Sequence, residues 1–571
     1  MLGSEMDNKE INLSTPKTTR SYTTFTPKWH RFNLHSKSNS NSTIISSSHT
    51  SSKTKNHAYT HQYNHMYTHR LDALRTRCLE RAKTENDPSL EDGKASQITP
   101  RIIELKEGVL STVVGTIVKD SPARPVFDTN YHSSAVFDPI GDADQNPLTL
   151  QPLRTYANED NDVVILEDES GRVELKSQDE NDTIDARKLV TGMVVAVTGI
   201  VQSNTGALEV SKIHYPALPT QKNPLKSTLN GEQDTFSTYS PYIMIVSGLH
   251  CGGTGMQYND INSSISLRRS MLCDYIAGHI YPNDDAVKIS RLIIAGGGCC
   301  RPQTESSEKL LSNQKFVARS NTTRKKNESS SYIKSLALSA QELDMFITEI
   351  CSSGIPVDLI PGLHDPTNAN LPQQPLHPCL LPYSSTFDVG DKGNDDSGLF
   401  HRATNPYQAE VGKILLLGSD GKNITDFRRY TSSFPSKENE SKTTIKKEDN
   451  ETSDKSEERS IMSPLEALEQ TLMCNHLAPT APDSLRCFPF YDKDPFVIDE
   501  CPHIYFTGNS PKFETKMFFD NGNRNNESVK CRLVCVPSFM ETGEAVLVNL
   551  HTLACECISF ADVLDENEVE K

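Results

Sequence analysis

The sequence lacks the features that mark zinc-binding, membrane-spanning or secreted proteins. Its 14 cysteines are scattered and form no CxxC or paired Cys/His spacing of the zinc type. No apolar run is long enough to span a bilayer, and the polar N-terminus has no apolar core of a signal peptide. We therefore expect a soluble intracellular protein whose thiols are reduced and mostly buried.

Hydrophobic and aromatic residues are scarce for so long a chain. Of 571 residues, 35% are hydrophobic and 7% aromatic, which is low for a chain folded throughout. Acidic residues outnumber basic ones by 75 to 58, for a formal charge of −17. This charge repels phosphate backbones on average, so we expect at most a local basic patch for DNA binding.

Several polar segments bury too little apolar area to fold. Residues 1–56 are rich in Ser, Thr, Asn and Lys and are predicted to be disordered. Polar insertions in surface loops are expected near 305–331, 388–397 and 432–460, and an acidic tail at 563–571. The basic run Arg324–Lys326 fits either a nuclear localisation signal or an ordinary solvated charge run.

An amphipathic helix is predicted in residues 57–84. Between Tyr59 and Ala82, apolar residues recur at spacings of three and four. His61, His65 and His69 share one face of this helix. That face has no clear acidic or cysteine partner, so a structural histidine row is favoured over a metal site.

Five β-rich runs between residues 98 and 218 predict a small OB-type barrel. They are Val109–Lys119, Val163–Glu167, Gly171–Lys176, Met193–Val201 and Gly206–His214. Gly115 and Gly199 interrupt two of them, where a small barrel has to bend.

The barrel carries few features of a single-strand-binding module. Such a module needs a basic groove with stacking aromatic rings. The five runs contain almost no aromatic residues, and their connecting loops are acidic, with Asp160, Asp162, Glu167, Asp168 and Glu169. We therefore expect a scaffold or interaction role, in which the acidic loops could contact a basic partner.

After a linker at 219–240, residues 241–562 alternate strands and helices. Strands at Tyr242–His250, Ser290–Gly298 and from Val357, with helices at Ile265–Ile280 and Ala340–Cys351, predict a layered α/β sheet. Later strands predict a second sheet packed on the first: Lys413–Leu417, His503–Thr507, Arg532–Pro537 and Ala545–Leu550. The glycine-rich GLHCGGTG lacks a P-loop lysine and does not match GxGxxG, so no nucleotide site is expected.

The stretch Ile355–Tyr383, IPVDLIPGLHDPTNANLPQQPLHPCLLPY, is the most informative one. A buried strand stops at Pro361-Gly362 and enters a proline-stiffened loop. This loop carries His364, Asp365, Asn368 and His377. Polar residues at a strand end indicate either a metal-dependent active site or a recognition surface.

Three stretches resemble the small, B-type subunits of replicative DNA polymerases, most closely those of DNA polymerase delta. They are the loop above, TNPYQAEVGKILLLGSDGKNITDFRRY, and HLAPTAPDSLRCFPFYDKDPFVIDECPHIYFTGNSPKF. The resemblance runs from about Pro100 through the C-terminal strands, and the helix at 57–84 also looks like its counterpart. It implies an OB-fold barrel packed on an inactive calcineurin-like phosphoesterase domain, a two-sheet sandwich flanked by helices.

Active enzymes of that superfamily hold two metals with DxH, GD and GNHD or GNHE motifs after successive strands and with later histidines. Here Ser247 and Gly296 stand at two ligand positions, and Leu363 stands where the Asn belongs. His364 and Asp365 remain, as weak metal ligands or, as we favour, loop-stabilising residues. We expect no catalytic residue, metal or cofactor.

The resemblance implies an accessory role in DNA replication and repair in the nucleus. It implies binding to the cysteine-rich C-terminal module of the polymerase delta catalytic subunit and bridging to a third subunit, with the sliding clamp and DNA reached indirectly and no membrane contact. The helix at 57–84 is a candidate docking element. Three alternatives stay open: a B-type small chain of polymerase alpha or epsilon, an active metallophosphoesterase, and a free-standing single-strand-binding module.

Overall fold

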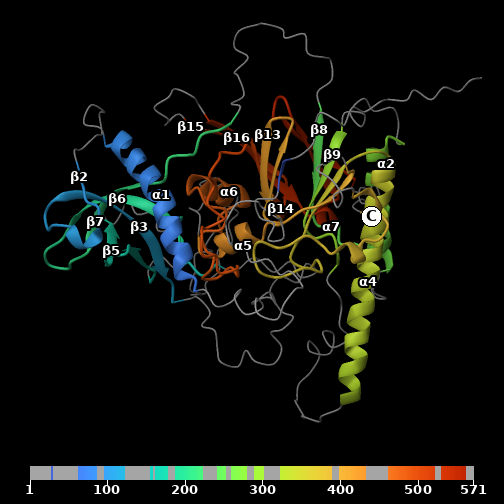
Figure 1. The fold of residues 1–571 in the computed structure, drawn as a ribbon, viewed down its shortest axis with the longest axis horizontal. Helices are drawn as coiled ribbons and strands as arrows, with labels where there is room; N and C mark the ends of the chain where they lie inside the picture. Colours follow the sequence, from blue (N-terminus) through green and yellow to red (C-terminus); the bar gives the residue numbers. More distant parts are fainter. Residues whose placement is uncertain are drawn as a thin grey trace, which may run out of the picture.

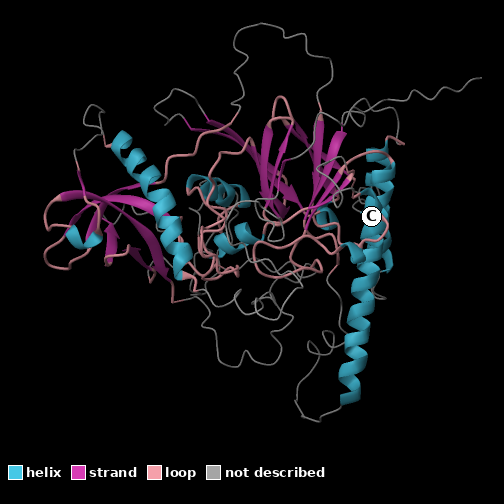
Figure 2. Ribbon diagram, viewed as in Figure 1, coloured by secondary structure: helices cyan, strands magenta, loops and turns pink. Residues whose placement is uncertain are grey.

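Three six-stranded sheets make up the computed structural model of the chain. It describes residues 28–29, 62–86, 96–122, 155–157, 161–177, 187–222, 241–252, 259–279, 289–300, 322–388, 398–431, 461–520 and 529–560. One sheet forms a barrel, and the other two face each other as a sandwich with helices on its outer faces (Figures 1 and 2). Among the described helices, none combines the length and hydropathy of a membrane span.

The predicted five-stranded barrel is confirmed. Its strands are β3 (Leu110–Asp120), β4 (Val163–Glu167), β5 (Arg172–Ser177), β6 (Val194–Val201) and β7 (Leu208–His214). They pair in the order β3-β4-β5-β7-β6, and β6 pairs back to β3. The short β2 (Gln97–Ile98) adds beside β3, and a 3-10 turn spans Ile102–Glu104. A Cβ on Gly199 would lie 2.3 Å from the Glu209 carbonyl oxygen, so this bend requires glycine.

The first sheet of the sandwich is built around parallel strands. Its order is β11 (Phe400–Arg402), β10 (Val357–Ile360), β9 (Ile289–Ala295), β8 (Tyr242–Val246), β17 (Glu544–Asn549) and β18 (Cys555–Ser559). The outer face packs against α2 (Asn259–Ala277) and α4 (Thr322–Ser352) in one apolar cluster. The N-terminal half of α4 extends beyond the sheets (Figure 1).

The second sheet lies against the first. Its order is β1 (Lys28–Trp29), β12 (Tyr407–Val411), β13 (Ile414–Ser419), β14 (Ile504–Ser510), β16 (Val529–Pro537) and β15 (Glu514–Asp520). Apolar side chains from both sheets, such as Ile245, Ile293, Leu416 and Phe506, fill the space between them. Shorter elements complete the fold: α5 (Lys422–Arg429), α6 (Pro464–Met473), α7 (Phe539–Thr542), and 3-10 turns at Pro378–Leu380 and Ser384–Phe387.

Three expectations about these elements were wrong. The run Ala545–Leu550 forms β17 of the first sheet, because it pairs antiparallel with β8 rather than joining β16. Residues 322–331 are helical rather than part of a loop insertion. They contain no proline or glycine, so the packed part of α4 propagates through them. Lys28–Trp29, placed in a disordered segment, forms strand β1.

Several other predicted segments fall outside the described residues. They are 305–321, 389–397, 432–460 and 561–571, most of 1–56, and residues 223–240 of the linker.

Helix α1 (Asn64–Glu85) lies between the barrel and the sandwich (Figure 1). Met66 of α1 belongs to an apolar core that also contains barrel residues such as Ile117 and Val195. The same core contains Leu468 and Phe496 from the C-terminal part of the chain. The barrel and the sandwich are therefore joined by continuous apolar packing.

Candidate functional site

The candidate site lies where β8, β9, β10, β13 and β14 end on one side of the sandwich. Glycine backbones fill this region. The Gly248 N–H donates to the Gly296 carbonyl at 2.9 Å. A Cβ on Gly296 would lie 2.4 Å from the Asp420 Cβ, and one on Gly362 would lie 2.4 Å from the Gly297 nitrogen. The strand ends approach too closely to leave room for a side chain at Gly296, where the resemblance expects a metal ligand.

Ser247, at the other position where the resemblance expects a ligand, makes contacts that hold the fold together. Its hydroxyl donates to the Pro537 carbonyl at 3.0 Å and accepts the Asn509 N–H at 2.8 Å. The residue is fully buried. Ser247 therefore ties β8 to the ends of β14 and β16.

Asp365 stabilises the turn after β10. Its carboxylate accepts backbone N–H groups from Gly362 at 2.7 Å, Cys299 at 2.7 Å and Gly298 at 3.3 Å. Burial raises the pKa of Asp365, although these hydrogen bonds oppose the shift. The carboxylate joins the β10 turn to the end of β9, and His364 lies half-buried beside it.

The other polar residues of the proline-rich loop contact the loop itself. The Asn368 side-chain oxygen accepts the Gln374 N–H at 2.6 Å. His377 Nδ1 accepts the Cys379 N–H at 3.2 Å. These contacts support a structural role for both side chains.

Sequence reasoning missed four polar residues that meet here: Gln373, Asn405, Asp420 and Asn509. The Asn405 amide donates to Gln373 Oε1 at 2.8 Å and to Asp420 Oδ1 at 2.7 Å. The Asn509 amide donates to the Asp420 carbonyl at 2.8 Å. Asn405, Asp420 and Asn509 each adjoin Gly or Pro, in the stretches TNPY, GSDG and TGNS, which have apolar neighbours. This pattern was the signal in the sequence that could have identified them.

These residues do not fit a dinuclear metal centre. Within the part of the chain that the structure describes, no three His, Cys, Asp or Glu side chains gather closely enough to hold a metal ion. Asp365 and Asp420 are occupied by backbone and amide donors. Burial, with Arg269 nearby, lowers the pKa of His250 after β8 to about 4. The arrangement can lock strand ends together, and it offers no set of free ligands among the described residues.

The helix predicted as a docking element is fixed to the rest of the chain at Arg70. This side chain is fully buried. Its Nε donates to Asp494 at 2.8 Å, and its terminal nitrogens donate to the carbonyls of Gly192, Pro479 and Ala481 at 3.0, 2.9 and 2.7 Å. One guanidinium thus joins α1, the barrel and the C-terminal part of the chain.

Asp494 has a second partner, His476. Burial raises the pKa of Asp494, but Arg70 and His476 outweigh burial and hold it well below its usual range. His476 Nδ1 accepts the Ala478 N–H at 3.2 Å, and Nε2 lies 2.9 Å from Asp494. Because Nδ1 is an acceptor, this geometry assigns the neutral tautomer with the proton on Nε2.

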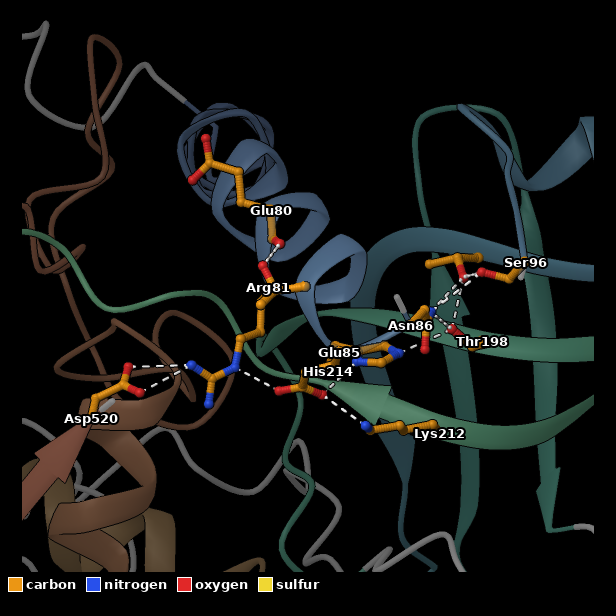
Figure 3. Close-up of polar contacts among 11 residues, drawn as sticks. Glu80, Arg81, Glu85, Asn86, Ser96, Thr198, Lys212, His214 and Asp520 are labelled. Carbon is orange, nitrogen blue, oxygen red and sulfur yellow. Dashed lines mark hydrogen bonds and ion pairs between the residues drawn. The ribbon is translucent and has the colours of Figure 1, made fainter. Parts of the chain in front are cut away.

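A second polar joint lies at the C-terminal end of α1 (Figure 3). Arg81 contacts Glu85 at 2.6 Å and Asp520 of β15 at 3.1 Å. Glu85 contacts His214 of β7 at 2.8 Å and Lys212 at 3.2 Å. Burial raises the pKa of Glu85, but its hydrogen bonds to His214 and Arg81 outweigh burial and lower it to about 2.

The histidine row contacts the chain's own C-terminal part. The His65 ring lies edge-on to the Tyr491 ring at 4.6 Å, and His69 Nε2 lies 2.8 Å from the Tyr491 carbonyl. His61 lies outside the described residues. These contacts support the structural interpretation of the row.

The acidic loops of the barrel are likewise engaged within the chain. Glu169 contacts Arg75 at 2.6 Å, and Asp162 contacts Lys119 at 3.3 Å with both side chains buried. Asp168 accepts the Ile102 N–H at 2.8 Å. Asp160 lies outside the described residues.

The loop between β3 and β4 is anchored on the sandwich. The Tyr156 N–H donates to the Arg429 carbonyl at 2.6 Å, and the rings of Tyr156 and Tyr430 lie 5.6 Å apart. Lys119 donates to the Tyr430 carbonyl at 3.1 Å. In OB folds this loop contributes to ligand binding, whereas here its described part holds the end of α5.

Two family models match most of the described fold. Residues 243–515 match the model for the B-type subunits of DNA polymerases alpha and epsilon. Residues 62–213 match the DNA polymerase delta subunit OB-fold domain. Together they define the class as B-type subunits of DNA polymerases.

Curated relatives narrow this class. The chain is 30% identical to the DNA polymerase delta small subunit of Arabidopsis thaliana, over 82% of this chain and 86% of the relative. The small subunits of Oryza sativa and Saccharomyces cerevisiae also share 30% identity, over 81% and 86% of this chain and 86% and 87% of their own lengths. The chain therefore belongs to the family of DNA polymerase delta small subunits.

A solved structure, that of the protein TT1561 of Thermus thermophilus, aligns with 10% identity. It covers 56% of this chain and 99% of its own, with a TM-score of 0.22. That similarity is too low to support an inference about the fold.

Proposed function

We propose that the chain is a non-catalytic scaffold subunit of a DNA polymerase delta holoenzyme, acting in replication and repair synthesis in the nucleus. The observation that carries this proposal is the closed strand-end site. Ser247 and Gly296 stand where the resemblance expects metal ligands, glycine backbones fill the space, and Asp365 accepts three backbone N–H groups. We infer that the sandwich is a calcineurin-like phosphoesterase domain whose metal chemistry has been lost.

The proposed partners are the cysteine-rich C-terminal module of the catalytic subunit and a third subunit that leads to the sliding clamp. A permanent assembly of this kind needs an interface of roughly 2,000 Å² or more. Continuous packing and the Arg70 clamp support this role, because they hold barrel and sandwich as one surface. The apolar face of α1 is buried in this chain, so this face is not free to dock a partner.

Purification of the tagged full chain from its own cells tests the assignment. The largest co-purifying chain is expected to be the catalytic subunit of polymerase delta. Recovery of the catalytic subunit of polymerase alpha or epsilon instead would overturn the proposal. The domain limits and the role of Arg324–Lys326 as a nuclear localisation signal stay predictions.

An active metallophosphoesterase is the second candidate, favoured only by the retained His364-Asp365 pair. Purified protein at high concentration with Mn²⁺ is expected to leave a generic phosphodiester intact. Hydrolysis that disappears in both His364→Ala and Asp365→Ala would establish the enzyme instead.

A further inference from the structure

Helix α4 has an exposed face as well as a buried one. Its buried face packs on the first sheet through residues such as Leu343 and Ile347, which are fully buried. On its outer face, Leu338 and Met345 are 57% and 59% exposed. These two side chains are seven residues apart, which places them two turns apart on one line along the helix. α4 lies on the side of the molecule away from the barrel and α1 (Figure 1), so neither of these covers the line.

Three exposed polar residues continue this line: Lys334, Gln341 and Glu349. Together with Leu338 and Met345 they follow one another at spacings of four, three, four and four, which is the spacing of one helix face. We call these five residues the α4 strip. Helices of coiled coils meet along seams of this spacing, and a single polar residue in such a seam fixes its register.

The α4 strip is complementary to itself. When two copies run antiparallel about a twofold axis between positions 341 and 342, Leu338 of each copy faces Met345 of the other. The same axis brings Lys334 of each copy opposite Glu349 of the other. The two Gln341 amides meet next to the axis, where each can both donate and accept a hydrogen bond. A parallel pair would instead place like charges side by side, so the charges favour the antiparallel arrangement.

The two carboxylates beside the strip are already engaged within the chain. Glu342 contacts Arg269 of α2. Asp344 accepts the Tyr383 N–H at 2.9 Å and the Ser384 N–H at 2.8 Å. These donors compensate both charges, so the carboxylates do not oppose a second copy near the axis. The Tyr383 side chain, 59% exposed, lies next to α4 and adds an apolar rim.

We propose that the α4 strip is a homodimerisation surface, on which the α4 helix of a second copy of this chain packs antiparallel. The self-complementary order of cation, apolar residue, amide, apolar residue and anion selects this partner. The strip has two large apolar side chains per copy, so the expected dimer is weak and reversible. This inference does not depend on the proposed polymerase role.

Sedimentation equilibrium of the full chain, at concentrations up to about 200 µM, tests the association. The wild type is expected to form a reversible dimer. Met345→Gln is expected to raise the Kd at least about tenfold, because the twofold axis removes two apolar contacts at once. Leu267→Gln on the neighbouring α2 is the control, since Leu267 is 53% exposed but lies outside the strip, and it should leave the Kd unchanged.

Two results of this experiment would overturn the proposal. One is a wild type that stays monomeric throughout, and the other is an equal loss of association in Met345→Gln and Leu267→Gln. If the wild type is monomeric and Met345→Gln instead releases a co-purifying polymerase subunit, the strip binds a different chain and the proposal is wrong.

A charge swap tests the antiparallel order. Lys334→Glu and Glu349→Lys are each expected to raise the Kd at least about threefold, because each places two like-charged pairs across the interface. The double variant restores opposite charges and is expected to restore the Kd. This recovery also shows that the single variants do not act by misfolding. An unrescued double variant would contradict the arrangement.

Chemical crosslinking tests the register directly. Within one α4 helix, Lys334 and Glu349 are separated by about 22 Å, given the rise per residue of an α-helix. A zero-length carbodiimide link between the two side chains can therefore form only between two copies. Mass spectrometry of a mixture of ¹⁴N- and ¹⁵N-labelled chains is expected to show the mixed-isotope link in the dimer fraction. A dimer fraction without this link would overturn the proposed packing.

Discussion

The strand-end site and the α1 clamp each bury an aspartate, but the two carboxylates lie in opposite electrostatic environments. Asp365 meets backbone N–H donors, and burial raises its pKa. Asp494 meets the Arg70 guanidinium and the His476 ring, and its pKa falls well below the usual range. Neutral donors thus hold a loop in shape, whereas a buried cation and anion hold distant parts of the chain together.

Replacing Arg70 is expected to lower the unfolding free energy more than any other substitution. Arg70→Met leaves Asp494 charged and three carbonyls without their donor, which should cost about 3–5 kcal/mol of unfolding free energy. Arg75→Met on the same helix breaks an exposed pair with Glu169 and should cost at most ~1 kcal/mol. Urea denaturation of the two variants measures both values. Equal costs would mean that the clamp does not join the domains.

The packing at the strand ends is tested with two glycines. Gly296 and Gly108 both have positive φ, +79° and +71°. A Cβ on Gly296 meets Asp420, whereas one on Gly108 meets nothing within 4 Å. Gly108→Ala should cost about 1–2 kcal/mol for backbone strain, and Gly296→Ala should cost roughly 1–3 kcal/mol more through overpacking. Thermal and urea unfolding compare the two, and an equal loss would contradict the closed site.

The pH dependence of the unfolding free energy of Asp365→Asn tests the raised pKa of Asp365. The amide keeps one acceptor oxygen for three N–H groups, so the variant should lose about 1–3 kcal/mol at pH 7. Because the folded pKa of Asp365 is raised above its usual 3.8, folding takes up a proton in that window. The stability of the wild type relative to the variant should therefore rise as pH falls through the folded pKa and level off below about 3.8. A difference that shrinks on acidification would contradict the raised pKa.

Glu85→Gln should cause the smallest loss of unfolding free energy. The pH dependence of this loss should be opposite in sign to that of Asp365→Asn. The folded pKa is lowered from 4.5 to about 2, so the stabilisation is present above about 4.5 and is lost as pH falls toward 2. The group is partly exposed, so the loss at pH 7 should stay below about 1 kcal/mol. Urea unfolding at pH 6 and pH 3 measures the change, with Glu80→Gln on the same helix as control. If the difference in unfolding free energy between wild type and Glu85→Gln is larger at pH 3 than at pH 6, the lowered pKa of Glu85 is contradicted.

The sequence predicted the barrel well because its strands are set by local patterns. β-rich composition and the turn residues between the runs placed β4 at its observed bounds and the other barrel strands within about two residues. The sheet to which β17 belongs was not predictable in this way. Its choice of β8 over β16 depends on a contact between residues about 300 apart in the chain.

The role of α1 could not be read from its pattern. An amphipathic pattern shows that one face is buried, but not which surface covers it. Arg70 sits beside the apolar positions of α1 and looks like an ordinary surface residue, because arginine is rarely buried without partners. Its partners lie at least 122 positions away along the chain. Likewise Gln373, Asn405 and Asp420 come from three separate loops and Asn509 from the end of β14, and no single stretch shows that they meet.

The shared core that α1 completes has a consequence for how the chain is made. Arg70 and Asp494 are 424 positions apart. At about 5–20 residues per second, the ribosome needs roughly 20–85 s to supply the second after the first. During that interval the apolar face of α1 and part of the barrel lack their final cover. The nascent chain therefore has to wait for its C-terminal residues, and its early apolar surface is a natural substrate for chaperones.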